Sequence, residues 1–101
     1  MRVELLVVPE CPNERLARER LHDALAATGR ADTPVAVHVI TEATLASAPA
    51  FGGSPTILVD GVDPFADQAA DSVGLSCRVY RTDAGLSGAP SVDALRRVLS
   101  D

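Results

Sequence analysis

Breaker residues divide the chain into runs with different hydrophobic periods. An almost continuous apolar run from Val3 to Val8 stops at Pro9, which is typical of a strand covered on both faces. From Pro12 onward the period becomes helical, and Gly29 provides a stop signal. The apolar side of this predicted helix consists of Ala17, Leu21, Ala24, Leu25 and Thr28.

The pattern then returns to a period of two. Residues Val35 to Ile40 alternate as a second strand, and two strands joined by one helix form a right-handed unit with parallel strands. A short helix over Glu42 to Ala48 and a third strand over Thr56 to Asp60 should follow. The turn at Asp60-Gly61 ends this strand.

The last third of the chain predicts a long loop, a strand and a helix. The loop from Val62 to Gly74 has no periodicity. In the expected fourth strand, Leu75 to Arg81, the positions Leu75, Cys77 and Val79 share the apolar face. Ser91 is expected to cap a final helix, whose apolar face carries Val92, Leu95, Val98 and Leu99.

Length and charge narrow the class of protein. The 101 residues make one domain, residues 1–101, with fourteen acidic residues against nine basic ones. This balance argues against nucleic acid as a partner. No apolar run is long enough to span a membrane, and no apolar segment follows Met1 as in a signal peptide. We therefore expect a cytoplasmic protein, without membrane contact, that is a monomer or weak dimer.

The two cysteines, Cys11 and Cys77, are too few and too far apart in sequence for a disulfide scaffold. Cys11 falls at the expected cap of the first helix, with Pro12 and Glu14 in its first turn. The unpaired N–H groups of a helix start favour a thiolate, which is the nucleophilic form. The structural alternative is that Cys11 only caps the helix, with Glu14 reaching back to its N–H as in a capping box.

A cysteine between a buried strand and a helix, followed by Gly-Ser-Pro-Thr-Ile-Leu-Val-Asp-Gly at the third strand, resembles the thioredoxin family. The resemblance covers nearly the whole chain. It implies an α/β fold of order β-α-β-α-β-β-α with a four-stranded mixed sheet in the order 2-1-3-4. The first and last helices would lie on one face of the sheet and the short helix on the other.

The resemblance also assigns roles to residues. Cys11 matches the nucleophilic cysteine of the family's C-x-x-C motif, and Pro55 matches its cis-proline. Glu14 stands where the family has a second, resolving cysteine, so both Cys11 and Glu14 are candidates for the catalytic site. Substrate would bind beside Pro12, Ser54, Pro55 and Thr56, with a cis bond exposing the Ser54 backbone for pairing.

A second resemblance concerns the tail. The stretch Gly-Leu-Ser-Cys-Arg-Val-Tyr around Cys77, followed by Ala-Pro-Ser, is similar to short actinobacterial thioredoxin-like proteins described as alkylmercury lyase relatives. It implies a soft-metal or organomercurial site made by Cys11 and Cys77. From the residues alone, Cys77 is instead a core residue on an apolar strand face. The aspartates of the loop do not match a calcium motif.

The sequence therefore suggests three candidate functions. The leading expectation is thiol–disulfide chemistry at Cys11, without a cofactor, on a thiol- or disulfide-bearing protein or a small-molecule thiol. The first alternative is a heavy-metal or organomercurial protein using Cys11 and Cys77. The second alternative is a non-catalytic binding module that retains only the groove of the fold.

Overall fold

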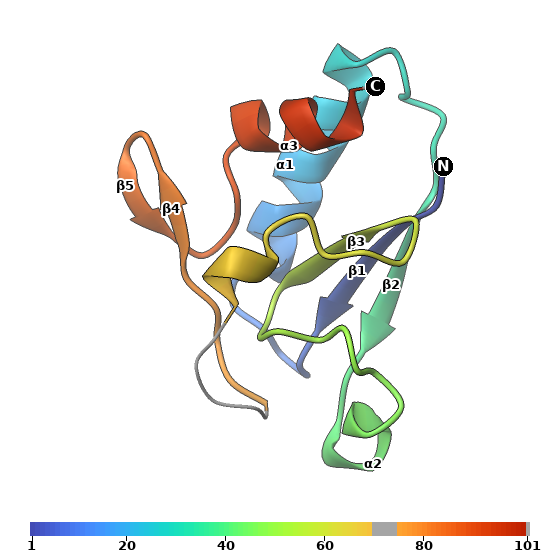
Figure 1. The fold of residues 1–101 in the computed structure, drawn as a ribbon, viewed down its shortest axis with the longest axis vertical. Helices are drawn as coiled ribbons and strands as arrows, with labels where there is room; N and C mark the ends of the chain where they lie inside the picture. The colour runs from blue at the N-terminus through green and yellow to red at the C-terminus, as the bar shows by residue number, and fades with distance from the viewer. Residues whose placement is uncertain (70–74, 101) are drawn as a thin grey trace.

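The computed structural model describes residues 1–69 and 75–100, which form a small α/β structure (Figure 1). Its helices and strands largely follow the sequence pattern. In chain order they are β1 (Val3–Val7), α1 (Glu14–Ala27), β2 (Val35–Val39), α2 (Glu42–Leu45), β3 (Thr56–Val59), the 3₁₀ helix η1 (Ala66–Gln68), β4 (Tyr80–Thr82), β5 (Gly85–Ser87) and α3 (Val92–Leu99). No helix in these ranges is both long and apolar enough to cross a membrane.

The main sheet has three strands in the order β2-β1-β3. Strand β1 pairs in parallel with β2 and antiparallel with β3, so Leu5 lies between Val37 and Ile57. The predicted parallel pair and the mixed character of the sheet are confirmed. The central strand is buried, whereas β2 is an edge strand with mostly exposed residues.

The expected fourth strand does not join this sheet. In the described part of the chain, β4 pairs with β5 in a separate two-stranded sheet, and the order 2-1-3-4 was wrong at its last position. In the described residues, the backbone of the segment before β4 pairs with the β3 side at an isolated parallel bridge between Ser54 and Cys77. A physical reason is that the backbone of Tyr80, Arg81 and Thr82 pairs instead with β5.

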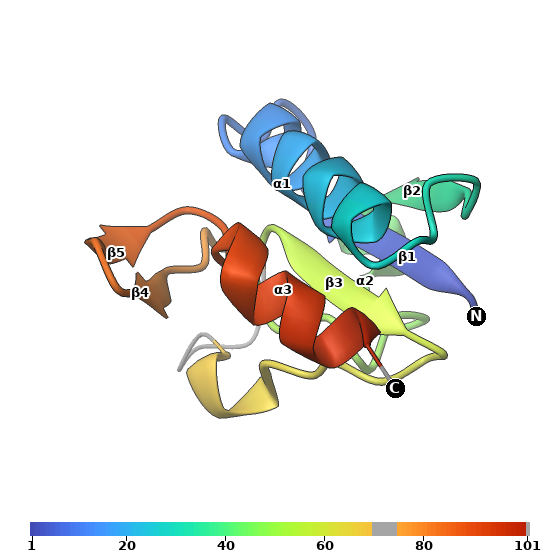
Figure 2. The same ribbon diagram turned by 90° about the horizontal axis from the view of Figure 1, so that it is seen from above.

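Helices cover the two faces of the sheet unequally. On one face, α1 and α3 pack on each other and on β1 and β3 (Figure 2). On the other face, a smaller cluster of Leu6, Ile40 and Leu58 is covered by residues of α2 and the segment after it. The first and last helices thus share a face and the short helix lies on the other, as predicted.

The predicted core of α1 is confirmed at Ala17, Leu21, Ala24 and Leu25, all of which are buried. Gly29 has a φ of 74°, which suits the end of a helix. The Ser91 hydroxyl accepts a hydrogen bond from the Ala94 N–H at 3.1 Å and caps α3, as expected. Part of the predicted loop, residues 70–74, lies outside the described residues.

Candidate functional site

Cys11 lies on the turn that joins β1 to α1. The helix begins at Glu14 and its cap is Asn13, so the prediction that Cys11 is the cap was wrong by two residues. The Cys11 N–H donates to the Val8 carbonyl at 3.3 Å, so it is not free for the capping box expected from Glu14. The Glu14 carboxylate instead meets Arg18 at 3.4 Å.

The turn from Val8 to Cys11 has a strained backbone. Glu10 adopts a φ of 58°, a region that side chains other than glycine rarely occupy. Pro9 precedes it, and this pair has the order proline then positive φ that a type II turn requires. Backbone strain of this kind is found disproportionately at functional sites.

A hydrogen bond ties this turn to the start of the third strand. The Val8 N–H donates to the Ser54 hydroxyl at 3.0 Å, and Val8 in turn accepts from Cys11. The Ser54-Pro55 peptide bond is cis, which confirms the expectation for this proline. The structure therefore brings the cysteine turn and the Ser54-Pro55 segment together, although they lie far apart in sequence.

The backbone of Ser54 is not open for a substrate strand. Its N–H donates to the Ser76 carbonyl at 2.8 Å, and its carbonyl accepts from the Arg78 N–H at 2.9 Å. The expectation that Ser54 exposes its backbone was wrong, because residues of this same chain already fill that edge. Of the four predicted substrate contacts, Ser54, Pro55 and Thr56 are buried and Pro12 is exposed.

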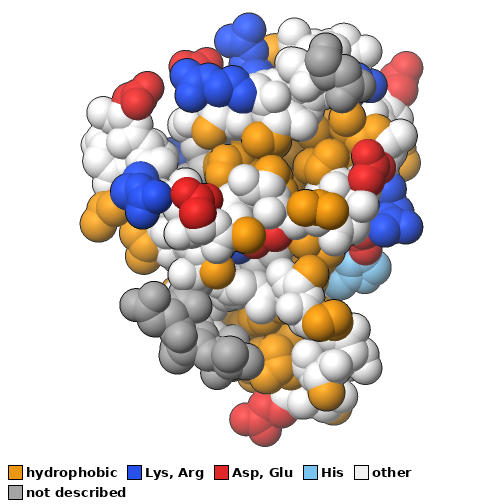
Figure 3. All heavy atoms as spheres, in the orientation of Figure 1, with side chains coloured by type: hydrophobic (Ala, Val, Ile, Leu, Met, Phe, Trp, Pro, Cys, Tyr) orange, Lys and Arg blue, Asp and Glu red, His pale blue; other side chains and the backbone are white. Residues whose placement is uncertain are grey.

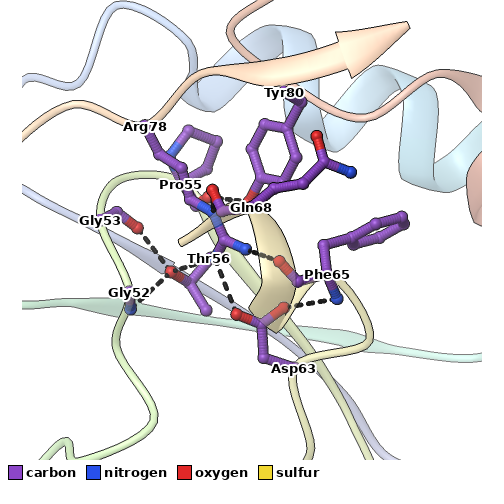
Figure 4. Close-up of polar contacts among 9 residues, drawn as sticks. All are labelled: Gly52, Gly53, Pro55, Thr56, Asp63, Phe65, Gln68, Arg78 and Tyr80. Atoms are coloured by element: carbon purple, nitrogen blue, oxygen red, sulfur yellow. Dashed lines mark hydrogen bonds and ion pairs between the residues drawn. The ribbon is translucent and has the colours of Figure 1, made fainter. Parts of the chain in front are cut away.

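Behind the cis bond lies a buried polar network centred on Arg78 (Figure 4). The Arg78 side chain has no solvent exposure and pairs with Asp63 at 2.8 Å. Its guanidinium also donates to the hydroxyl of Thr56 at 3.2 Å and to the carbonyl of Phe65. Sequence analysis missed this network, because an arginine in a strand is ordinarily an exposed residue.

Tyr80 completes the network. Its hydroxyl donates to the carbonyl of Pro55, and its ring lies 4.6 Å from the central guanidinium carbon of Arg78. Phe65 packs edge-on against the same ring, with 5.8 Å between ring centroids. Burial raises the pKa of the Tyr80 phenol above its ordinary value, and the nearby Arg78 charge opposes that rise.

The alternation of the segment before β4 is opposite to the predicted one. Arg78 and Tyr80 point into the protein, while Leu75, Cys77 and Val79 are exposed. Cys77 was therefore wrongly placed on a buried face. Both cysteines are free thiols, Cys11 buried and Cys77 exposed.

Cys11 lines an open groove that follows the outer side of α1. The groove has a volume of about 570 Å³ and is lined by Cys11, Glu14, Arg15, Arg18, Glu19 and His22. Cys11 is only 9% exposed, so this groove is a route by which a reagent can approach it. The charged lining comes from successive turns of one helix.

Within residues 1–69 and 75–100, no group of three or more His, Cys, Asp or Glu side chains is arranged to hold a metal ion. A soft-metal site of two cysteines is a different arrangement, and it stays a prediction. Comparisons with family models, curated proteins and solved structures found no match to this chain.

Proposed function

We propose that this protein is a thioredoxin-like thiol protein in which Cys11 is a single nucleophile for thiol–disulfide exchange. The proposal rests on the sequence resemblance and on the order β2-β1-β3 with α1 and α3 on one face. The fold alone does not determine the chemistry. The argument for chemistry comes from the surroundings of Cys11.

The observation that carries the proposal is the position of Cys11 on a strained turn that lines an open groove. The positive φ of Glu10 directly precedes it, and the Val8 bond to Ser54 fixes the turn against the third strand. A cysteine that served only as core packing would need neither a costly backbone nor access to a charged groove. A thiol that reacts needs a defined position and a path for its substrate.

In this proposal the second thiol comes from outside the chain, since Cys11 and Cys77 are both free thiols and are not joined in a disulfide. Glu14 occupies the sequence position of the resolving cysteine, and its carboxylate is paired with Arg18. Cys77 is exposed on the segment that pairs with Ser54. Cys11 would therefore form a mixed disulfide with its substrate, and a free thiol would release it.

A single-thiol variant tests this proposal. In Cys77→Ser, the remaining thiol is Cys11, and we expect bis(2-hydroxyethyl) disulfide to form a mixed disulfide that intact-mass spectrometry detects. A cysteine-free variant, Cys11→Ser with Cys77→Ser, is the matched control. A folded Cys77→Ser protein whose Cys11 forms no adduct, while the urea-unfolded chain does, would overturn the proposal.

A further inference from the structure

We infer that the substrate of Cys11 is a small dipolar thiol or disulfide that binds along the outer side of α1, and not an extended protein segment. This inference rests on the proposed function and names its substrate class. Two independent features of the structure support it: the filled backbone edge at Ser54 and the charged groove beside Cys11.

The first feature removes the docking edge for a peptide. A peptide that adds to a sheet edge gains its affinity from backbone hydrogen bonds. At Ser54 both backbone groups are already bonded to Ser76 and Arg78. The side chain of Arg78, which has no exposed surface, is in turn held by its ion pair with Asp63, whose side chain is 9% exposed, and breaking a pair with so little exposure is costly. A protein strand would have to displace this segment before it could bind.

The second feature is the size and charge of the groove. Cys11 lies at its N-terminal end and His22 at its far end. Glu14 and His22 are separated by about 12 Å along the helix axis, because a helix rises about 1.5 Å per residue. An extended tripeptide is about 10 Å long, so a ligand of that size whose sulfur meets Cys11 can reach the nearer part of the groove, where Arg15 and Arg18 lie within about 6 Å of Glu14 along the axis.

The charges of the groove are available to such a ligand. Arg15 pairs with Glu19 at 3.0 Å, and the Arg15 side chain is 91% exposed. Arg18 pairs with Glu14 at 3.4 Å and is about half exposed. Exposed pairs of this kind are weak, so each arginine can turn to a ligand carboxylate, which it binds through two hydrogen bonds. The released glutamates suit a ligand ammonium group.

Formation of the mixed disulfide needs only Cys11 and the substrate disulfide. The Cys11 thiolate attacks one sulfur of the substrate disulfide, a new sulfur–sulfur bond forms, and the old one breaks. The leaving thiolate carries the electron pair and takes a proton from solvent. Cys11 is oxidised and half of the substrate is reduced, and a second small thiol reverses the change by attacking the mixed disulfide.

The test compares two disulfides in the Cys77→Ser background. Glutathione disulfide carries carboxylates and ammonium groups, whereas bis(2-hydroxyethyl) disulfide is uncharged. Each rate of adduct formation at Cys11 is divided by the rate of the same reagent with the urea-unfolded chain. For glutathione disulfide, we expect Arg15→Ala with Arg18→Ala to lower this ratio about tenfold, as for loss of one charged hydrogen bond. The ratio for the uncharged reagent should not change.

Arg96→Ala with Arg97→Ala is the matched control, because both residues are exposed and lie on α3. It removes the same charge as the groove variant and should leave both ratios unchanged. If the groove variant lowers neither ratio, or the control lowers the glutathione ratio equally, the inference is overturned while the proposed function stands. If neither reagent modifies folded Cys11, the proposed function itself fails.

Discussion

Arg78 is a full charge with no exposed side-chain surface. Such a group is tolerated only when its charge is paired and its N–H groups are bonded. Asp63 supplies the negative charge that pairs with the guanidinium. Thr56 and two loop carbonyls accept further hydrogen bonds from Arg78. At the scale of the residue, this one side chain connects the loop after β3, Thr56 of β3 and the ring of Tyr80.

Replacing Arg78 should therefore be among the most destabilising changes. We expect Arg78→Met to lower the free energy of unfolding by about 3–5 kcal/mol, because it leaves the Asp63 carboxylate buried and unpaired. Arg81→Met is the control, since Arg81 is 68% exposed and pairs only at 3.6 Å with Asp67; its effect should stay within about 1 kcal/mol. Urea unfolding measures both, and equal effects would contradict the buried network.

Tyr80 allows a spectroscopic test of the buried network, because it is the single tyrosine and the chain has no tryptophan. Burial raises its pKa in the folded protein, whereas an unfolded tyrosine has a pKa of about 10. Its contribution to stability is therefore fully present below about pH 10 and is lost as the pH rises above that value.

The ultraviolet absorbance of tyrosinate, followed beside the circular dichroism signal, should show ionisation only well above pH 10 or together with unfolding. The variant Tyr80→Phe should lose this part of the alkaline decline. Ionisation at the ordinary value in a chain that is still folded would contradict the burial of the phenol.

At the scale of elements, the turn that carries Cys11 also packs against the segment between β5 and α3. A Cβ added to Gly88 would lie 2.2 Å from the side chain of Asn13, the cap of α1. Arg20 of α1 bonds the same segment through the Ala89 carbonyl at 2.9 Å. The start of the first helix is thus positioned by a segment near the end of the chain.

This contact predicts a coupled pair of substitutions. Gly88→Ala should cost about 1–3 kcal/mol of unfolding free energy, because the new methyl group displaces the Asn13 side chain. In Asn13→Gly the same change should cost much less, which gives a double-mutant cycle with an interaction energy above about 0.5 kcal/mol. Additive effects in urea unfolding would show that the two residues do not touch.

The elements differ in how far sequence could define them. The strand at Val3 to Val8 and the core of α1 were predicted correctly, because burial on both faces gives the strand a continuous apolar run and burial of one face gives the helix its period. The segment Leu75 to Arg81 was assigned the opposite phase. Its more polar side faces inward because Arg78 finds a carboxylate in a distant loop, and no local pattern contains that information.

The candidate site was also predicted only in part from the sequence. Cys11 and Pro55 could be selected from sequence, because each stands beside a strand boundary that breaker residues mark. The cap of α1 is Asn13, because its carbonyl accepts the first hydrogen bond of the helix from the Ala17 N–H. The pairing of Ser54 with Ser76 and Arg78 depends on tertiary packing, which spacing alone does not encode.

On the scale of the whole molecule, the structure distinguishes the two thiols. Cys11 belongs to the core shared by β1, α1 and α3 and also lines the α1 groove. Cys77 is exposed on the segment that pairs with Ser54. Charged side chains of both signs lie around exposed apolar groups on the face shown in Figure 3. A reagent thus meets the two cysteines in different surroundings.

The most direct test asks whether Cys11 reacts while the protein is folded. In Cys77→Ser, the rate of alkylation by iodoacetamide at neutral pH is measured for the folded protein and for the same chain unfolded in urea, with a free cysteine peptide correcting for the effect of urea. The account predicts measurable alkylation of Cys11 in the folded protein, within about tenfold of the corrected rate for the unfolded chain, because Cys11 lines the open α1 groove although it is only 9% exposed. A folded protein whose Cys11 is alkylated only as fast as the chain unfolds would show that the thiol is protected as core packing, and it would contradict the central claim.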